Sequence, residues 1–179
     1  MLKIILIALP VIVVVFLIIV ALRPSEFRVT RAARVSAPPA AVFAHVNDLH
    51  KWEAWSPWAK MDPAAKSTFA GSPAGPGASM AWAGNNKVGE GSMTITESRP
   101  NELIRFRLDF LKPFKASNTA EFTFKPEGKQ TAVTWSVTGR NNFMFKAVGL
   151  FMNCDKMLGG QFEQGLANLK SVTEVVAVK

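Results

Sequence analysis

The hydrophobic pattern begins with a long apolar run at the N-terminus. Between Ile4 and Leu22 there is no charged residue, and Pro10 is the one helix-breaking residue. As a helix, these nineteen residues rise about 28 Å, which is close to the thickness of the hydrocarbon core of a bilayer. The run therefore predicts a transmembrane anchor over residues 1–24.

A cleaved signal peptide is the alternative interpretation of this run. Its apolar region is normally about 7–15 residues long and ends at a small-x-small site, of which Ile19-Val20-Ala21 is a poor example. Basic residues near the ends of a span set its orientation. Lys3 precedes the run, and four arginines follow it: Arg23, Arg28, Arg31 and Arg34. This excess favours a single-pass membrane protein whose domain faces the cytoplasm.

The remaining pattern predicts one domain over residues 25–175, followed by a short tail, 176–179. Residues 26–35 alternate apolar and polar side chains, as a half-buried strand does. Residues 40–49 place their apolar side chains on one helical face. Residues 51–63 hold three of the five tryptophans, and Pro57 interrupts any continuous helix there. We expect a short helix in this segment and then an irregular corner.

Period-two alternation then recurs in five segments that are separated by loop or turn residues: 78–83, 88–98, 103–111, 116–125 and 131–138. Successive strands with short turns favour an antiparallel meander with one buried face. From Phe143 to Thr173 the apolar period becomes that of one long helix. Glycines inside this stretch allow close approach to a sheet, or leave room for something else: Gly149, Gly159, Gly160 and Gly165.

Composition and charge narrow the class of function. The net charge is +8, but basic and acidic residues are spread along the domain, and no run of five basic residues occurs. We therefore expect no nucleic-acid partner. One cysteine and two histidines that are five residues apart make a dedicated metal site improbable. No nucleophile-elbow, dinucleotide-binding or phosphate-binding loop motif is present, so no cofactor is expected.

Four segments resemble the START-like helix-grip superfamily, also called SRPBCC, and within it the polyketide cyclase/dehydrase group. They are SAPPAAVFAHVNDLHKWEAWSPWAKMDP, GASMAWAGNNKVGEGSMTITESRP, FLKPFKASNTAEFTF and CDKMLGGQFEQGLANLK, and the resemblance covers residues 27–172. It implies an α+β fold in which an antiparallel sheet of about six to seven strands wraps around a long C-terminal helix. With the N-terminal run, the fold class becomes a helix-grip domain preceded by one transmembrane helix.

The resemblance also implies a deep apolar cavity between the sheet and the long helix, in which members of the group bind hydrophobic small molecules or lipids. The candidate ligand-binding residues are those expected to face it: Trp55, Trp58, Trp82, Met93, Phe106, Phe110, Trp135, Phe151, Asp155 and Leu158. The alternative for each tryptophan is a place in the core of a small domain. Trp82 and Trp135 are the more natural cavity residues because they fall in the middle of predicted strands.

Asp155 falls on the apolar stripe of the predicted helix, between Phe151 and Leu158. A carboxylate there must be paired, protonated or solvated by water in a cavity. It is the one weak candidate for a catalytic residue, through proton transfer, and it is also a candidate for orienting the polar group of a ligand. The alternative is a salt bridge to a Lys or Arg at the end of a strand.

Other chemically notable residues have plainer interpretations. Glu90, Glu121 and Arg107 are expected on the outer face of the sheet, and His45 on the surface of the first helix of the domain. The segment from Lys112 to Lys115 resembles an exposed hairpin tip, whose basic and aromatic side chains suit contact with a membrane surface. Cys154 has no histidine near it in sequence to activate a thiol.

The function predicted from these features is binding of a lipid or another hydrophobic small molecule by a membrane-anchored START-like domain, without catalysis. A polyketide cyclase-like enzyme using acid/base chemistry, and a ligand-free interaction or stress-response module, are the alternatives. Membrane and an apolar small molecule are thus the expected partners, and the oligomeric state is left open.

Overall fold

The computed structural model describes residues 2–177, without the side chains of residues 2–8, 154, 176 and 177. In chain order, the elements are α1 (Leu2–Leu22), β1 (Glu26–Val35), α2 (Pro39–Asn47), the 3-10 helices η1 (Leu49–Ala54) and η2 (Pro57–Lys60), β2 (Lys66–Ala70), β3 (Ser79–Ala83), β4 (Glu90–Arg99), β5 (Leu103–Lys112), β6 (Ala116–Glu127), β7 (Gln130–Arg140), α3 (Phe143–Val148) and α4 (Cys154–Ala177). The predicted tail falls largely outside the residues described in full.

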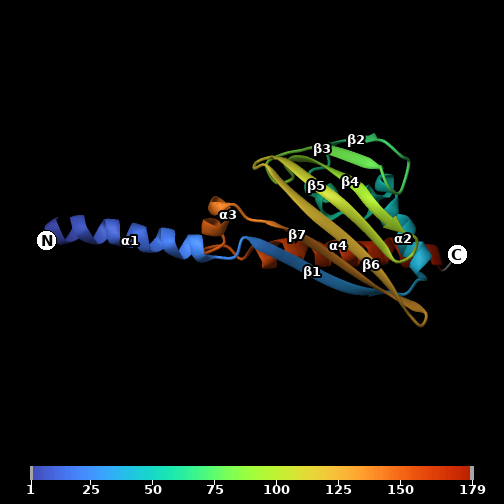
Figure 1. Cartoon of the computed structure of the whole chain (residues 1–179). Coiled ribbons are helices and arrows are strands. Elements are labelled where there is room, and N and C mark those ends of the chain that lie inside the picture. The colour runs from blue at the N-terminus through green and yellow to red at the C-terminus, as the bar shows by residue number, and fades with distance from the viewer. Residues whose placement is uncertain (1, 178–179) are drawn as a thin grey trace.

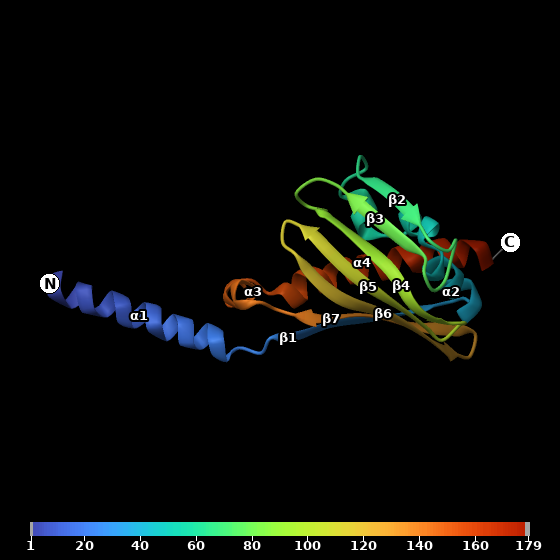
Figure 2. The same cartoon turned by 45° about the horizontal axis from the view of Figure 1, so that its top comes forward.

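The strands form one seven-stranded sheet in the order β1-β7-β6-β5-β4-β3-β2, and every neighbouring pair is antiparallel. Five hairpin-type connections join β2 to β7 in sequence order, and β1 closes the far side by pairing with β7. Figures 1 and 2 show α4 running along one face of this curved sheet, with α2 beside its C-terminal half. The α+β helix-grip architecture predicted from the sequence is therefore present.

The alternating pattern explains which face of the sheet meets α4. In β4 to β7 apolar side chains on one face of the sheet are buried, among them Ile95, Phe106, Phe122 and Trp135. From α4, three side chains spaced by four and three residues join this core: Phe162, Leu166 and Leu169. Burial of one sheet face against one helix stripe is the main source of stability for such a two-layer domain.

The predicted continuous helix from Phe143 to Thr173 is wrong, because the structure divides it into α3 and α4. The side chain of Asn142 accepts a hydrogen bond from the Phe145 amide at 3.0 Å, and that of Asn153 accepts one from the Lys156 amide at 2.9 Å. Each asparagine thus satisfies a free amide at a helix start. Gly149 follows Val148 as the C-terminal cap of α3. Two local capping signals therefore override an apolar stripe that stays in phase across the break.

Strand β2 is not among the segments that the sequence pattern predicts as strands. All five of its residues are exposed, so it shows no alternation between a buried and a solvated face. Its identity as a strand comes from pairing with β3, in which Lys66 lies opposite Ala83 and Ala70 opposite Ser79. Pairing of this kind leaves no trace in hydrophobic periodicity.

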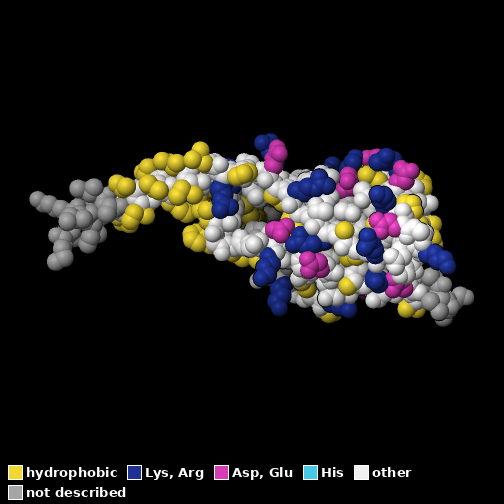
Figure 3. Space-filling model, turned by 90° about the horizontal axis from the view of Figure 1, so that it is seen from below, with side chains coloured by type: hydrophobic (Ala, Val, Ile, Leu, Met, Phe, Trp, Pro, Cys, Tyr) yellow, Lys and Arg dark blue, Asp and Glu magenta, His cyan; other side chains and the backbone are white. Residues whose placement is uncertain are grey.

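Helix α1 leads away from the sheet domain and meets it near α3 (Figure 1), where the rings of Phe16 and Phe151 lie 6.4 Å apart. Figure 3 shows apolar side chains covering the described part of α1, whereas Lys, Arg, Asp and Glu are interspersed over the visible face of the domain. The amino group of Lys146 donates to the backbone oxygen of Ala21 at 3.2 Å, which adds a polar contact at this junction.

Within the residues whose side chains are described, no helix has the length and apolar content needed to cross a membrane. Residues 1–8, on which the first part of the predicted anchor falls, lie outside them. The finding contradicts the predicted single-pass anchor and the predicted membrane localisation with a cytoplasmic domain.

Candidate apolar ligand site

A cavity of about 590 Å³ lies between the concave face of the sheet, the 3-10 helices and the N-terminal half of α4. Its floor comes from β3 to β7, through residues such as Met80, Phe106 and Val137. Leu158 and Phe162 close it from α4. Residues 49–65, which contain η1 and η2, together with β2, form the remaining wall. The volume is within the range of roughly 300–1,000 Å³ that is usual for small-molecule sites.

Seven of the ten predicted ligand-binding residues line this cavity: Trp58, Trp82, Met93, Phe106, Phe110, Trp135 and Leu158. The strand residues among them converge because their side chains alternate to the same face of a continuous sheet. Room for the Trp82 ring depends on Gly91, since a Cβ atom at that position would lie 2.6 Å from Trp82 Cζ2. A register shift between Glu90 and Gly91 marks the bulge at this point.

Trp55, Phe151 and Asp155 are the three predicted residues that do not line the cavity. Trp55 is fully buried in the core, where its ring contacts Trp52 at 4.5 Å and its N–H donates to the backbone oxygen of His45 at 3.2 Å. Phe151 is 80% exposed in the segment that joins α3 to α4. Because this segment is not helical, the predicted stripe does not carry Phe151 toward the sheet.

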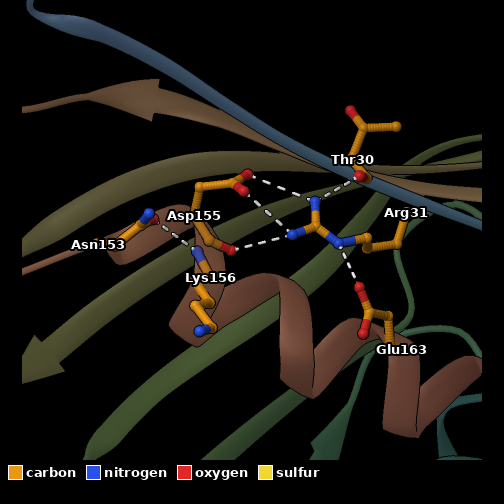
Figure 4. A network of polar contacts seen from close by, with 6 residues as sticks. All are labelled: Thr30, Arg31, Asn153, Asp155, Lys156 and Glu163. Carbon is orange, nitrogen blue, oxygen red and sulfur yellow. Dashed lines mark hydrogen bonds and ion pairs between the residues drawn. The ribbon is translucent and has the colours of Figure 1, made fainter.

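Asp155 belongs to an ion-pair network outside the cavity, formed with Arg31 of β1 and Glu163 of α4 (Figure 4). The Arg31 guanidinium lies 3.1 Å from the Asp155 carboxylate and 2.7 Å from that of Glu163. Hydrogen bonds to Asp155, and then to Glu163, raise the pKa of Arg31 above its usual value. The Asp155 side chain is 59% exposed, so the network is a solvated clamp between α4 and the edge strand.

The salt-bridge interpretation of Asp155 is therefore the one that its geometry supports. Its arginine partner comes from within β1 rather than from the end of a strand. Gly159 makes the clamp possible, because a Cβ atom there would overlap the Arg31 guanidinium. Acid/base chemistry in the cavity loses its one candidate residue, since Asp155 is not part of the lining.

Several lining residues are not among the ten predicted ligand-binding residues. Trp52, Phe162, Leu108 and Ala120 continue the apolar wall, and their burial pattern or helical spacing is the signal that identifies them. The polar part of the lining was missed entirely: Glu53, Ser56, Lys60, Asp62, Ser67 and Asn118. Four of these six residues come from residues 49–65, where no periodicity relates a residue to a face.

Asp62 fixes the backbone of this segment through hydrogen bonds. Its carboxylate accepts hydrogen bonds from the amides of Ala64 at 3.1 Å and Asn85 at 2.6 Å. The second contact ties the segment after η2 to the loop between β3 and β4. Asp62 therefore stabilises the wall of the cavity, and the two backbone amides compensate the charge of its carboxylate.

The outer face of the sheet carries the charges expected there. Arg105 of β5 pairs with Glu97 of β4 and with Glu121 of β6, at 2.8 Å from the latter. Lys112 pairs with Glu90 at 2.8 Å, and Arg107 with Asp109 at 2.8 Å. A hydrogen bond from the Ser117 hydroxyl is the main reason that the pKa of Asp109 lies below its usual value.

His45 differs from its predicted surface position, because it is half-buried and its Nδ1 atom is buried with no hydrogen-bond partner among the described residues. Burial lowers the pKa of His45, and the nearby Lys51 lowers it further. At the predicted hairpin tip, Phe114 is exposed and its ring contacts Phe145 of α3 at 5.2 Å.

Among the residues described, no group of three or more His, Cys, Asp or Glu side chains is arranged to hold a metal ion. The side chain of Cys154 lies outside them, so the prediction that it is not a reactive thiol stays a prediction. The lining of the cavity consists of aromatic and aliphatic side chains with a smaller polar part.

Solved structures share this architecture at low sequence identity. They include protein CV1439 from Chromobacterium violaceum (17% identity, 85% of this chain and 99% of that chain, TM-score 0.58) and TTHA0849 from Thermus thermophilus (16%, 84% and 99%, TM-score 0.62). The Aha1 dimer from Colwellia psychrerythraea is similar as well (12% identity, 83% and 97%, TM-score 0.59). Such likeness shows the fold alone, and it confirms the helix-grip prediction.

A search among curated proteins found no match. A family model described as polyketide cyclase/dehydrase and lipid transport matches residues 26–174, which is nearly all of the chain beyond α1. The predicted resemblance to the SRPBCC superfamily and its polyketide cyclase/dehydrase group is therefore confirmed, and the chain belongs to the polyketide cyclase/dehydrase and lipid transport family.

Proposed function

We propose that this protein binds an apolar small molecule, such as a lipid, in the cavity between the sheet and α4. The single observation that carries the proposal is the cavity itself, about 590 Å³ in volume and lined mainly by aromatic and aliphatic side chains. A void of this size costs stability when its apolar walls contact nothing. An apolar occupant removes that cost and leaves water at the same time, which makes binding favourable.

The walls also support a ring-containing or branched occupant. Trp52, Trp58, Trp82, Phe106 and Phe110 all line the cavity. Aromatic side chains favour edge-to-face or offset contacts with other rings, each worth about 0.5–1.5 kcal/mol beyond the area that they bury. The words "lipid transport" in the description of the family agree with an apolar ligand, and a lipid is the finer form of the proposal.

The test is to purify the full-length chain gently and identify co-purifying small molecules by native mass spectrometry followed by organic extraction. In parallel, binding of N-phenyl-1-naphthylamine, whose fluorescence rises in an apolar environment, is titrated. Ala120→Phe places a ring into the cavity from β6, where Ala120 is buried and lines it. Thr119→Phe is the matched control, because Thr119 is exposed on the opposite face of the same strand.

We expect the wild-type chain and Thr119→Phe to bind the probe, and Ala120→Phe to bind it at least tenfold more weakly. Circular dichroism establishes that both variants are folded. Equal binding by all three chains, or no binding and no co-purifying molecule in the wild type, overturns the proposal.

A further inference from the structure

Asn118 of β6 is a polar side chain on the apolar, concave face of the sheet. Residues that lie directly opposite each other on neighbouring strands point to the same face. Pairing from β2 to β6 places five residues in one row across this face: Phe69, Met80, Met93, Leu108 and Asn118. All five line the cavity. Among the described residues, Asn118 is the one polar residue that β3 to β7 contribute to the lining.

The rows on either side show that Asn118 lies within the floor of the cavity rather than at its margin. Ala120, two residues later in β6, pairs with Val137 of β7, and both line the cavity. On the other side, Phe110 of β5 lies opposite Ala116 and lines the cavity as well. Asn118 is half-buried, so part of its surface is accessible, and its side chain points to the face that the cavity occupies.

Gly139 of β7 leaves the space that the Asn118 carboxamide occupies. A Cβ atom at Gly139 would overlap Oδ1 of Asn118 and would lie 2.7 Å from Cε1 of Phe27, which pairs with Gly139 from β1. Any larger residue at position 139 would therefore displace the carboxamide or the ring. The carboxamide thus lies over the backbone of β7, on the same face as the cavity-lining Val137.

The carboxamide of Asn118 forms no hydrogen bond with any of the described residues. Its neighbours across the strands are the hydrocarbon side chain of Leu108 and the ring of Phe27. Thr131 is the other polar residue on the concave face of β6 and β7, and its hydroxyl donates to the backbone oxygen of Ala37 at 2.7 Å. Burial of a polar group is costly unless a partner replaces the water that it loses. Asn118 is therefore a polar group to which the protein supplies no partner.

We infer that Asn118 is a ligand-binding residue and that its carboxamide forms a hydrogen bond with a hydroxyl group on an otherwise apolar ligand, an alcohol or a phenol. The inference rests on the proposed function, because it names the ligand class of the same site. A carboxamide has an oxygen acceptor at one end and two N–H donors at the other. A hydroxyl group both donates and accepts, so it matches whichever end faces it. An entirely apolar ligand would instead leave the carboxamide buried without a partner.

The charges of the lining favour a neutral ligand group at this position. Among the described residues, the charged members of the lining are Glu53, Lys60 and Asp62, and all three come from residues 49–65. Strands β3 to β7 contribute none, so a carboxylate or an ammonium group bound at Asn118 would have no counter-ion in the floor of the cavity. Burial of an unpaired charge costs far more than one hydrogen bond recovers. An uncharged hydroxyl group is consistent with this environment.

The test compares two probes of nearly the same shape, 2-naphthol, which has a hydroxyl group, and 2-methylnaphthalene, which has a methyl group in its place. Their affinities for the full-length chain are measured by equilibrium dialysis at neutral pH, where 2-naphthol is uncharged. The ratio of the two affinities is the readout. A change in the shape of the cavity affects both probes alike, whereas loss of the hydrogen bond weakens the binding of 2-naphthol alone.

Two variants remove the carboxamide. Asn118→Leu replaces it by a hydrocarbon of similar size, and Asn118→Ala removes it without adding bulk. Thr131→Val is the matched control, because it removes a polar group from the same face of the sheet at a buried position that does not line the cavity. We expect the ratio of 2-naphthol affinity to 2-methylnaphthalene affinity to fall by roughly two- to tenfold in both Asn118 variants and to stay at the wild-type value in Thr131→Val.

The outcomes separate this inference from the proposed function. If both probes bind the wild-type chain and the Asn118 variants keep the wild-type ratio, the carboxamide does not bind the hydroxyl group, and the inference is overturned while the apolar site stands. An equal fall of the ratio in Thr131→Val overturns it as well, because the effect is then not specific to the cavity floor. Circular dichroism establishes folding, and if one Asn118 variant does not fold, the other decides. If neither probe binds and no apolar molecule co-purifies with the wild type, the proposed function fails, and the inference fails with it.

Discussion

The close packing of α4 against the sheet predicts that alanine has different effects on stability at two glycines of this helix. Gly165 faces Trp135 and Pro57, and a Cβ atom there would lie 2.8 Å from Trp135 Cζ3 and 3.1 Å from Pro57 Cδ. Gly160, on the same helix, is exposed, and among the described residues a Cβ atom there would meet nothing within 4 Å apart from its chain neighbours and the backbone of its own helix. Alanine at the two sites therefore tests close packing against open space, within one element.

The magnitudes follow from two opposing effects. In a helix, alanine is more favourable than glycine by about 0.8–1 kcal/mol, and this gain applies to both substitutions. At Gly165 the added methyl meets a stacked, buried indole and a proline ring, neither of which is the free end of a flexible side chain. Overpacking of this kind costs about 1–3 kcal/mol. We expect Gly160→Ala to stabilise the protein by nearly 1 kcal/mol, and Gly165→Ala to be neutral or destabilising by up to about 2 kcal/mol.

Chemical unfolding of the full-length chain in guanidinium chloride, followed by tryptophan fluorescence and circular dichroism, measures both free energies of unfolding. The difference between the two variants isolates the packing cost, since their helix-propensity gains cancel. For a chain of this size, that difference of about 1–3 kcal/mol corresponds to roughly 2–12 °C in melting temperature. We also expect Gly165→Ala to bind the naphthylamine probe more weakly, because the added methyl group must push the Trp135 ring toward the cavity.

The reasoning is refuted if Gly165→Ala stabilises the protein as much as Gly160→Ala does. The helix would then have room for a side chain at this contact. A loss of stability in both variants would refute it as well, because nothing in the surroundings of Gly160 opposes an added methyl.

Three further predictions follow from the ion pairs, the exposed aromatic residue and the buried histidine. Asp155→Ala should lower the melting temperature slightly at low salt and less at 1 M NaCl, because its pairing with Arg31 is partly solvated, and probe affinity measured by fluorescence should not change. Phe151→Ala should likewise leave probe affinity unchanged, and a tenfold loss would place this residue at the site. Burial lowers the pKa of His45 below its ordinary value of 6.5, so the unfolded chain takes up a proton more readily as the pH falls below about 6.5. Between pH 7.5 and 5.5, guanidinium midpoints should therefore fall more in the wild type than in His45→Gln, and equal slopes would contradict the assignment to His45.

The sheet and most of the cavity floor were predictable because they depend on the simplest signal in the chain. Apolar and polar side chains alternate along most of β4 to β7, and burial of one face selects the apolar set that includes Met93, Phe106 and Trp135. The prediction of the five strand residues among the seven lining residues needed only this period and the resemblance to a known architecture. No knowledge of loop geometry entered it.

The features that were predicted wrongly depend instead on contacts between distant residues or on a local helix cap. The stripe from Met144 to Leu169 stays in phase with a helix, yet Asn153 begins a new helix in the middle of it. Asp155 then lies in the first turn of α4, where Arg31 of β1 reaches it. Trp52 of η1 and Trp55, which directly follows η1, are three residues apart and touch each other, but only Trp52 reaches the cavity. Periodicity cannot distinguish these two neighbours.

The edge strand β2 has a consequence for how the wall of the cavity can open. It is five residues long, all of them exposed, and it pairs with β3 alone, yet Ser67 and Phe69 contribute to the cavity wall. The ring of Phe69 in β2 stacks on the ring of His50 in η1, and the two ring centroids lie 4.0 Å apart. Short, solvated segments of this kind open locally at a small fraction of the free energy of global unfolding. The part of the cavity wall that β2 forms is therefore expected to open before α4 and the rest of the sheet do.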